Sequence, residues 1–304
     1  MNDPLRTDVA IVGAGPAGLS AALWCDELGL DALVLEAGRE PGGQLLWTYN
    51  SIENYLGFEA ADGREARDRF VDQIRRRGLN IRPESVAASV ALRPLRVGLS
   101  KGETIEPRAV IIATGVRRNE PDLENLEHFR GRGILESGKR DKDLAIGKTV
   151  MVVGGGDAAF ENALILAGTA DKVFLVHRRE TFRARQEFTD AVRDNSKIEI
   201  ITNSEVARLE GDGGLESVTL TGDGQERGLS VGALIFRIGV RPNSELVQHL
   251  VATDSRGYIR IDSSCRTDQE GIYAVGDVAN PVSPTISSAS GMGATAAKAV
   301  FSWL

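Results

Sequence analysis

Residues 8–24 read DVAIVGAGPAGLSAALW, and this stretch decides the fold of the chain that follows it. The apolar residues 9–12 predict a buried parallel strand, which runs into a loop with glycine at its first, third and sixth positions. A helix is expected over residues 19–28, and a second strand over residues 32–35, ending in Glu36. Strand, glycine loop, helix, strand and terminal acid in this order are typical of a dinucleotide-binding βαβ unit.

Each glycine of the first loop has its own physical task in such a unit. Gly13 permits the tight turn, Gly15 lets the backbone approach a pyrophosphate, and Gly18 lets the helix pack closely on the strand. The free N–H groups at the start of the helix favour anionic phosphates. Glu36 follows the second strand, where a carboxylate can accept hydrogen bonds from ribose hydroxyls.

A second unit of the same kind begins at residues 148–168, KTVMVVGGGDAAFENALILAG. Residues 150–153 predict its first strand, and residues 154–159 carry the spacing G-x-G-x-x-A. A helix is expected over residues 158–167. The next strand, residues 172–176, ends in His-Arg-Arg where the first unit has an acid.

The exchange of an acid for arginines predicts which nucleotide the second unit binds. A carboxylate would repel a 2′-phosphate, whereas Arg178 and Arg179 can bind it through charge-assisted hydrogen bonds, and Arg183 adds a third cation nearby. The alternative is a solvated basic turn. The place of these residues at the end of the second strand favours a site for NADPH. Two fingerprints in one chain indicate a flavin that accepts hydride from a nicotinamide.

Composition excludes several classes of protein. The 304 residues predict two domains, and the net charge of -7 argues against binding through nucleic-acid phosphates. No apolar run approaches the roughly 20 residues of a membrane helix, and no secretory signal is seen. The two cysteines, Cys25 and Cys265, form no disulfide framework, which favours the cytoplasm. Three scattered histidines predict no metal site.

Several further segments resemble the low-molecular-weight thioredoxin reductase family, and the match runs nearly end to end. These segments are residues 41–45 (PGGQL), 52–58 (IENYLGF), 113–115 (ATG), 177–179 (HRR), 182–184 (FRA), 239–243 (GVRPN) and 271–277 (GIYAVGD). The resemblance and the first fingerprint together imply an FAD site at Gly13, Gly15, Pro16, Ala17, Gly18, Glu36, Gly43, Gln44, Asn54, Ala113, Thr114, Gly115, Gly276, Asp277, Thr285 and Ile286. The resemblance and the second fingerprint together imply an NADPH site at Gly154, Gly156, Asp157, Ala158, Ala159, His177, Arg178, Arg179 and Arg183.

The resemblance also implies an α/β fold of two Rossmann-like domains, with the NADPH domain inserted into a discontinuous FAD domain. The expected segments are residues 1–117 and 246–304 for FAD, and residues 118–245 for NADPH. Residues 86–106 alternate in polarity and contain turn residues, which predicts a β-meander within the first unit. A C-terminal helix, expected from about Gly291, would direct its positive end at the flavin.

One departure from the family pattern bears on function. Thioredoxin reductases carry C-x-x-C followed by Asp just before the second fingerprint. Here an ungapped count from Gly154 puts Ser137 and Arg140 at the two cysteine positions, and Asp141 at the acid. We therefore expect no redox disulfide in this chain. Arg140 would favour the reduced flavin if it lay beside it, and the alternative is a solvated loop.

Other departures narrow the choice among relatives. Pro284 and Thr285 stand where the family usually has Arg-Gln. Ala17 stands where bacillithiol-disulfide reductases carry a cysteine. The residues given end at Trp303-Leu304, so the aromatic lid of the ferredoxin or flavodoxin reductases of this fold is not expected.

These observations predict an NADPH-dependent FAD oxidoreductase that serves an external acceptor. The acceptor would be a ferredoxin- or flavodoxin-type carrier, a quinone or another small molecule. One alternative is a flavoprotein that binds NADPH poorly and acts as a redox-responsive regulatory module, and another is a ferredoxin-linked disulfide reductase. The resemblance implies a homodimer, and neither nucleic acid nor a membrane is an expected partner.

Overall fold

The computed structural model describes residues 3–304 and divides into two compact units. Unit 1 contains the chain up to Arg117 and again from Arg241 to Leu304, and unit 2 contains Arg118–Val240. The chain passes between them in two paired strands, β7 (Val116–Arg118) and β15 (Val240–Pro242). The sequence analysis expects the second boundary between residues 245 and 246, whereas the structure has it between Val240 and Arg241. Residues 241–245 therefore belong to unit 1. Asn243 holds them there, because its backbone N–H donates to the Gly115 carbonyl at 3.0 Å.

Unit 1 is built on a sheet in the order β3-β2-β1-β6-β5-β4, with β16 also paired to β6. Its strands are β1 (Leu5–Val12), β2 (Ala32–Leu35), β3 (Asn80–Arg82), β4 (Ala87–Leu92), β5 (Leu95–Leu99), β6 (Thr104–Ile112) and β16 (Ile272–Ala274). Strands β1, β2, β3, β6 and β16 pair in parallel, and β4, β5 and β6 form the expected antiparallel meander.

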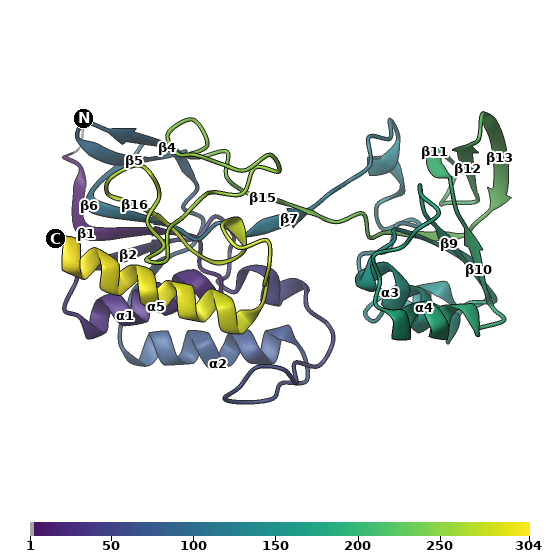
Figure 1. Ribbon diagram of the computed structural model, residues 1–304, viewed down its shortest axis with the longest axis horizontal. Helices are drawn as coiled ribbons and strands as arrows, with labels where there is room; N and C mark the ends of the chain where they lie inside the picture. Colours follow the sequence, from purple (N-terminus) through teal and green to yellow (C-terminus); the bar gives the residue numbers. More distant parts are fainter. Residues whose placement is uncertain (1–2) are drawn as a thin grey trace. The chain divides into compact units, whose positions relative to one another are not determined.

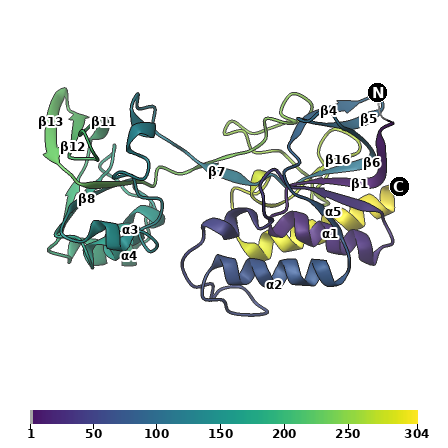
Figure 2. The same cartoon turned by 180° about the vertical axis from the view of Figure 1, so that it is seen from behind.

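Three helices lie together on one side of this sheet, as Figure 1 shows and Figure 2 repeats from behind. They are α1 (Pro16–Glu27), α2 (Gly63–Arg76) and α5 (Ile286–Trp303). Their apolar residues and one face of the sheet form a core around Ile11, Ile111 and Tyr273. The other face of the sheet forms a second core with the meander and residues 246–261.

Unit 2 combines a parallel sheet with a small antiparallel one. The parallel sheet has the order β10-β9-β8-β14, from β8 (Thr149–Val153), β9 (Lys172–Val176), β10 (Ile198–Ile201) and β14 (Ala233–Phe236). The antiparallel sheet contains β11 (Glu205–Glu210), β12 (Ser217–Gly222) and β13 (Gln225–Ser230). Helices α3 (Asp157–Ala167) and α4 (Gln186–Arg193) complete the unit, and apolar cores lie on both faces of the parallel sheet.

Short 3₁₀ helices occur at η1 (Gly43–Trp47), η2 (Leu126–Phe129), η3 (Lys142–Ala145) and η4 (Gly276–Val278). Two helix starts differ from the sequence prediction. Helix α1 begins at Pro16, inside the glycine loop, because proline at the first helical position needs no hydrogen-bond partner for its nitrogen. Helix α5 begins at Ile286, well before Gly291, because the Thr285 hydroxyl caps it by accepting from the Ser288 N–H at 3.1 Å.

Candidate functional site

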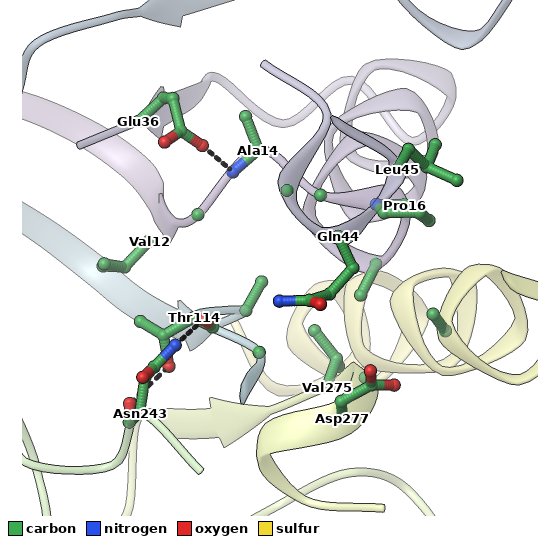
Figure 3. A pocket seen from close by; sticks show the side chains of 18 of the residues that line it. Val12, Ala14, Pro16, Glu36, Gln44, Leu45, Thr114, Asn243, Val275 and Asp277 are labelled. Atoms are coloured by element: carbon green, nitrogen blue, oxygen red, sulfur yellow. Dashed lines mark hydrogen bonds between the residues drawn. The ribbon is translucent and has the colours of Figure 1, made fainter. Parts of the chain in front are cut away.

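A cavity of about 850 Å³ opens in unit 1 at the carboxyl ends of the parallel strands. Seven separate stretches of the chain contribute to its lining: residues 12–17, 35–37, 43–54, 85–88, 113–115, 243–246 and 275–289. Figure 3 shows part of this lining, with the Gln44 side chain directed toward the middle of the cavity. Ligands of open parallel sheets bind at this edge, and the volume suits a molecule as large as a dinucleotide.

The residues expected to bind FAD come together around this cavity. Gly13, Gly15, Pro16, Ala17, Glu36, Gly43, Gln44, Asn54, Ala113, Thr114, Gly115, Gly276, Asp277, Thr285 and Ile286 all line it. Gly18 does not line the cavity. It faces the Gly13 backbone instead, since a Cβ at this position would lie 1.9 Å from the Gly13 carbonyl oxygen. The absence of a side chain at Gly18 therefore lets helix α1 approach β1, and this glycine contributes to packing.

Two glycine segments form the narrow part of the cavity. A Cβ on Gly43 would lie 3.0 Å from the Gly15 Cα, so Gly15 and Gly43 face each other without side chains. Gly13 has a φ of 107°, and a Cβ there would lie 2.4 Å from the Ala113 carbonyl oxygen. The exposed backbone and the N-terminus of α1 together form a cradle that suits a pyrophosphate.

Glu36 is held by the first glycine loop itself. One carboxylate oxygen accepts the Ala14 N–H at 2.9 Å, as Figure 3 shows, and the other accepts the Gly38 N–H at 2.7 Å. These bonds fix the carboxylate at the end of β2, where it also lines the cavity. A carboxylate held this way can accept hydrogen bonds from the hydroxyls of a ribose.

Asp277 is the second acid of the cavity, and it differs from Glu36 in its surroundings. Burial raises the pKa of its carboxyl above the ordinary value of an aspartic acid. Among residues 3–304 no hydrogen bond or ion pair to this carboxylate is seen. A half-buried acceptor of this kind fits a hydroxyl-bearing chain such as that of a flavin, and the cavity as a whole fits FAD.

Polar groups on residues near the cavity are fixed by backbone partners. Gln44 donates from Nε2 to the Val116 carbonyl at 2.6 Å. Thr114 donates from Oγ1 to the Asn243 carbonyl at 2.6 Å, and Asn243 donates from Nδ2 to the Thr114 carbonyl at 2.8 Å (Figure 3). The sequence motif around Asn243 was recognised, but its place in the cavity wall was not predicted. Residues 85–88 at the start of β4 also line the cavity, and the sequence analysis did not place them there.

The second fingerprint has a similar shape but a more closed surface. The His177 ring covers Gly155, where a Cβ would lie 2.4 Å from the ring, and Arg183 donates its N–H to the Gly155 carbonyl at 2.7 Å. Burial, followed by the charges of three neighbouring arginines, lowers the pKa of His177. Gly156 has open space around its Cα, so the start of helix α3 is accessible there.

The predicted NADPH residues do not all lie in one place. Gly154 and Ala159 pack against each other beneath the glycine loop, whereas Gly156, Asp157 and Ala158 lie at the accessible start of α3. Arg185 binds Asp157, donating from Nε at 2.8 Å.

A separate cavity of about 530 Å³ is lined by Arg178, Arg179, Asn203, Glu205, Thr221, Gly222, Asp223 and Gly224. The six residues that accompany the arginines were not predicted, although Asp223-Gly224 is a recognisable hairpin turn.

The segment at the expected dithiol position forms one turn of helix-like backbone. The Asp141 N–H donates to the Ser137 carbonyl at 2.9 Å, and Ser137 is buried. Burial opposes the charged form of Asp141, but hydrogen bonds from Arg140 and from the N–H groups of Ser137 and Glu136 lower its pKa. Arg140 forms an ion pair with Asp141 through its Nε, so its charge is partly neutralised within the turn.

Comparison with known proteins identifies the family to which the chain belongs. Residues 7–295 match the family model of the pyridine nucleotide-disulphide oxidoreductases. The chain is 35% identical to the thioredoxin reductase of Mycolicibacterium smegmatis over 301 residues, which cover 98% of this chain and 96% of that protein. The chain belongs to the thioredoxin reductase family of pyridine nucleotide-disulphide oxidoreductases.

Solved structures of the thioredoxin reductase family have the same fold. The Lactococcus lactis enzyme matches with a TM-score of 0.87 and 29% identity, covering 98% of both chains. The T. acidophilum enzyme matches with a TM-score of 0.84 and 27% identity, again covering 98% of both chains. Members of this family are FAD- and NADPH-dependent oxidoreductases, which confirms the predicted fold and cofactors.

Two expected absences concern metals and membranes. In residues 3–304 no group of three or more His, Cys, Asp or Glu side chains is placed to hold a metal ion. Across the same described residues, no helix combines the length and apolar character needed to cross a bilayer.

Proposed function

We propose that this protein is an NADPH-dependent FAD oxidoreductase that delivers electrons to an external acceptor, without a redox disulfide of its own. One observation carries the proposal: Ser137 and Arg140 stand at the positions where the family resemblance places the two cysteines. A serine hydroxyl and a guanidinium have no thiol–disulfide chemistry. The segment at these positions forms a turn, and neither side chain carries a sulfur atom.

The two cysteines of the chain support the same conclusion. Cys25 and Cys265 are both buried in the core of unit 1. Burial raises the pKa of Cys25 to about 12 and that of Cys265 to about 11. Because the thiolate is the reactive form, neither residue can act as a redox nucleophile at neutral pH in the native protein.

In this proposal the residues of the two cavities bind and orient, and no side chain forms a covalent intermediate. The glycine cradle, Glu36 and Asp277 hold the flavin nucleotide, and Arg178 with Arg179 holds the 2′-phosphate of NADPH. FAD, when bound, supplies the chemistry of accepting a hydride from NADPH and releasing two electrons and a proton afterwards. Two one-electron carriers, or one two-electron acceptor such as a quinone with an added proton, balance that release.

The first experiment is anaerobic mixing of the yellow protein with NADPH. We expect the absorption band of the oxidised flavin at about 450 nm to bleach, because hydride transfer converts the flavin to its reduced form. Ferredoxin, flavodoxin, quinones and ferric chelates are then added one at a time, and the acceptor is the one that restores the band fastest. Thioredoxin, followed by a dithiol assay, is the matched negative acceptor.

Two results would contradict the proposal in different ways. Retention of FAD without bleaching by NADPH would instead support the regulatory-module alternative. Rapid NADPH-dependent reduction of thioredoxin would show that this protein reduces disulfides without the dithiol, and would remove the external-carrier assignment.

A further inference from the structure

The second cavity of unit 2 has two walls of different origin. One wall is Arg178-Arg179, which follows β9. The other comes from residues 203–205 and from the turn at residues 221–224 that joins β12 to β13. The first wall belongs to the dinucleotide-binding unit, whereas the second belongs to the small antiparallel sheet.

Backbone contacts hold the second wall against the first. The Ser204 N–H donates to the His177 carbonyl at 3.2 Å, which ties the chain entering β11 to the end of β9. A Cβ on Gly222 would lie 2.2 Å from the Asn203 carbonyl oxygen, so the hairpin turn approaches this segment as closely as glycine allows. The hydrogen bond and the close approach both involve backbone atoms. The position of the second wall therefore depends little on individual side chains.

The charges on the two walls are opposed. Arg178 Nη1 lies 3.9 Å from Glu205 Oε1, and each side chain is 62% exposed. Glu205 pairs across the sheet with Thr221, and Asp223 adds a second carboxylate at the turn. The lining of this cavity therefore holds two arginines and two acids, of which Arg178 and Glu205 form an ion pair.

We propose that Glu205 is a specificity-determining residue that competes with the 2′-phosphate of NADPH for Arg178. This inference rests on the proposed NADPH site and concerns how strongly that site prefers the phosphorylated nucleotide. A phosphate dianion that binds Arg178 competes with the attraction of this side chain to the Glu205 carboxylate, and it then lies close to a like charge. Both effects weaken the binding of NADPH, whereas NADH, which lacks the 2′-phosphate, experiences neither.

The test measures nucleotide-fragment binding by calorimetry on the FAD-containing full chain. The probe is 2′,5′-ADP, and 5′-AMP is the matched ligand without the 2′-phosphate. Glu205→Gln should bind 2′,5′-ADP about three- to tenfold more tightly than the wild type, with 5′-AMP unchanged. The gain should shrink in about 0.5 M salt, because exposed charges are screened. In steady-state kinetics the KM for NADPH should fall while kcat stays constant.

Glu210→Gln is the control. Glu210 lies on the same strand, is 55% exposed and is paired with Arg208, but it does not line the cavity. An equal gain in this variant would show a general charge effect and overturn the inference. Unchanged or weaker binding of 2′,5′-ADP by Glu205→Gln would also overturn it, leaving the NADPH site in place. If the wild type itself does not prefer 2′,5′-ADP over 5′-AMP, the NADPH site is wrong and the inference fails with it.

Discussion

Gly15 and Gly18 belong to the same loop, but their surroundings give them different tasks. A Cβ on Gly18 would collide with the Gly13 carbonyl oxygen at 1.9 Å, whereas a Cβ on Gly15 would meet only the Gly43 Cα at 3.8 Å. At Gly18 the protein itself fills the space that a side chain would need. At Gly15 this space is open and borders the place proposed for the pyrophosphate.

This difference predicts opposite phenotypes for two alanine variants. Gly18→Ala should lower the free energy of unfolding by at least about 2 kcal/mol, because backbone atoms must move to admit the methyl group. Gly15→Ala should fold with near wild-type stability and lose affinity for FAD by at least about tenfold, because the methyl group occupies the pyrophosphate approach. Chemical denaturation and flavin titration of the apoprotein separate the two effects. Normal FAD binding by Gly15→Ala would contradict the cradle.

Asp277 permits a prediction about pH. Burial raises the pKa of its carboxyl, so the folded state prefers the protonated form and loses stability as the pH rises through that pKa. Asp277→Asn mimics the protonated form. In the flavin-free protein it should therefore raise the unfolding temperature at pH 7, and the gain should vanish near pH 3. Thermal melts at both pH values measure this, and a loss of stability at pH 7 would show that the carboxylate is better paired than its surroundings indicate.

The turn at residues 137–141 allows the proposed loss of the redox disulfide to be tested. Positions 137 and 140 are three residues apart on a helical turn, so their side chains lie on neighbouring positions of one face. The double variant Ser137→Cys with Arg140→Cys should form a disulfide on oxidation. We expect two additional thiols after reduction, in contrast to a wild type whose two native cysteines are buried. Thiol titration before and after oxidation measures this, and Ser137→Cys alone is the control.

At the scale of elements, the close approach of helices α1 and α5 organises unit 1. A Cβ on Gly293 of α5 would lie 2.3 Å from the Ala17 carbonyl oxygen and 2.8 Å from the Ala21 nitrogen of α1. Gly291, two residues earlier, is exposed and has open space where its side chain would be. The contact places α1, and with it the first glycine loop, next to the start of α5, where Thr285 and Ile286 line the cavity.

These two glycines form a matched pair for testing the helix contact. Gly291→Ala should stabilise the protein by about 0.5–1 kcal/mol, because alanine is the better helix former and nothing obstructs its methyl group. Gly293→Ala should destabilise it by about 1–3 kcal/mol, because the same methyl group forces the helices apart. Equilibrium unfolding of both variants gives the two signs. Equal effects would mean that the helices can separate without cost.

At the scale of the whole molecule, each unit has its own core and its own candidate nucleotide site. The candidate FAD cavity is lined entirely by residues of unit 1, and the cavity with Arg178 entirely by residues of unit 2. A ligand that binds only the folded state stabilises the part of the protein that it contacts. The two nucleotides should therefore protect different parts of the chain.

Hydrogen exchange tests this separation. Removal of FAD should increase amide exchange at residues 13–18, 43–54 and 275–286, while residues 149–176 of unit 2 keep their protection. Addition of NADP⁺ should protect residues 154–159 and 203–224 and leave the FAD peptides unchanged. Loss of protection throughout the chain on FAD removal would contradict the independence of the two units.

The sequence by itself determined the two fingerprint units, because glycine spacing and apolar runs act over a few neighbouring residues. Strands β2 and β9 were predicted with their observed bounds. Helix starts were less certain, since Pro16 and Thr285 act through local capping that competes with the glycine pattern. The proposal that Ser137 and Arg140 replace the two cysteines also comes from the sequence, because it concerns residue identity and spacing alone.

Only the tertiary structure decided which distant segments meet. Asn243 and residues 85–88 reach the candidate FAD cavity because the chain returns to unit 1 after leaving it and because the meander joins the sheet edge. Glu205 faces Arg178 because a hairpin packs against the end of β9, and no local pattern encodes that contact. Local spacing specifies a turn or a strand, whereas a cavity wall depends on pairing between segments far apart in the sequence.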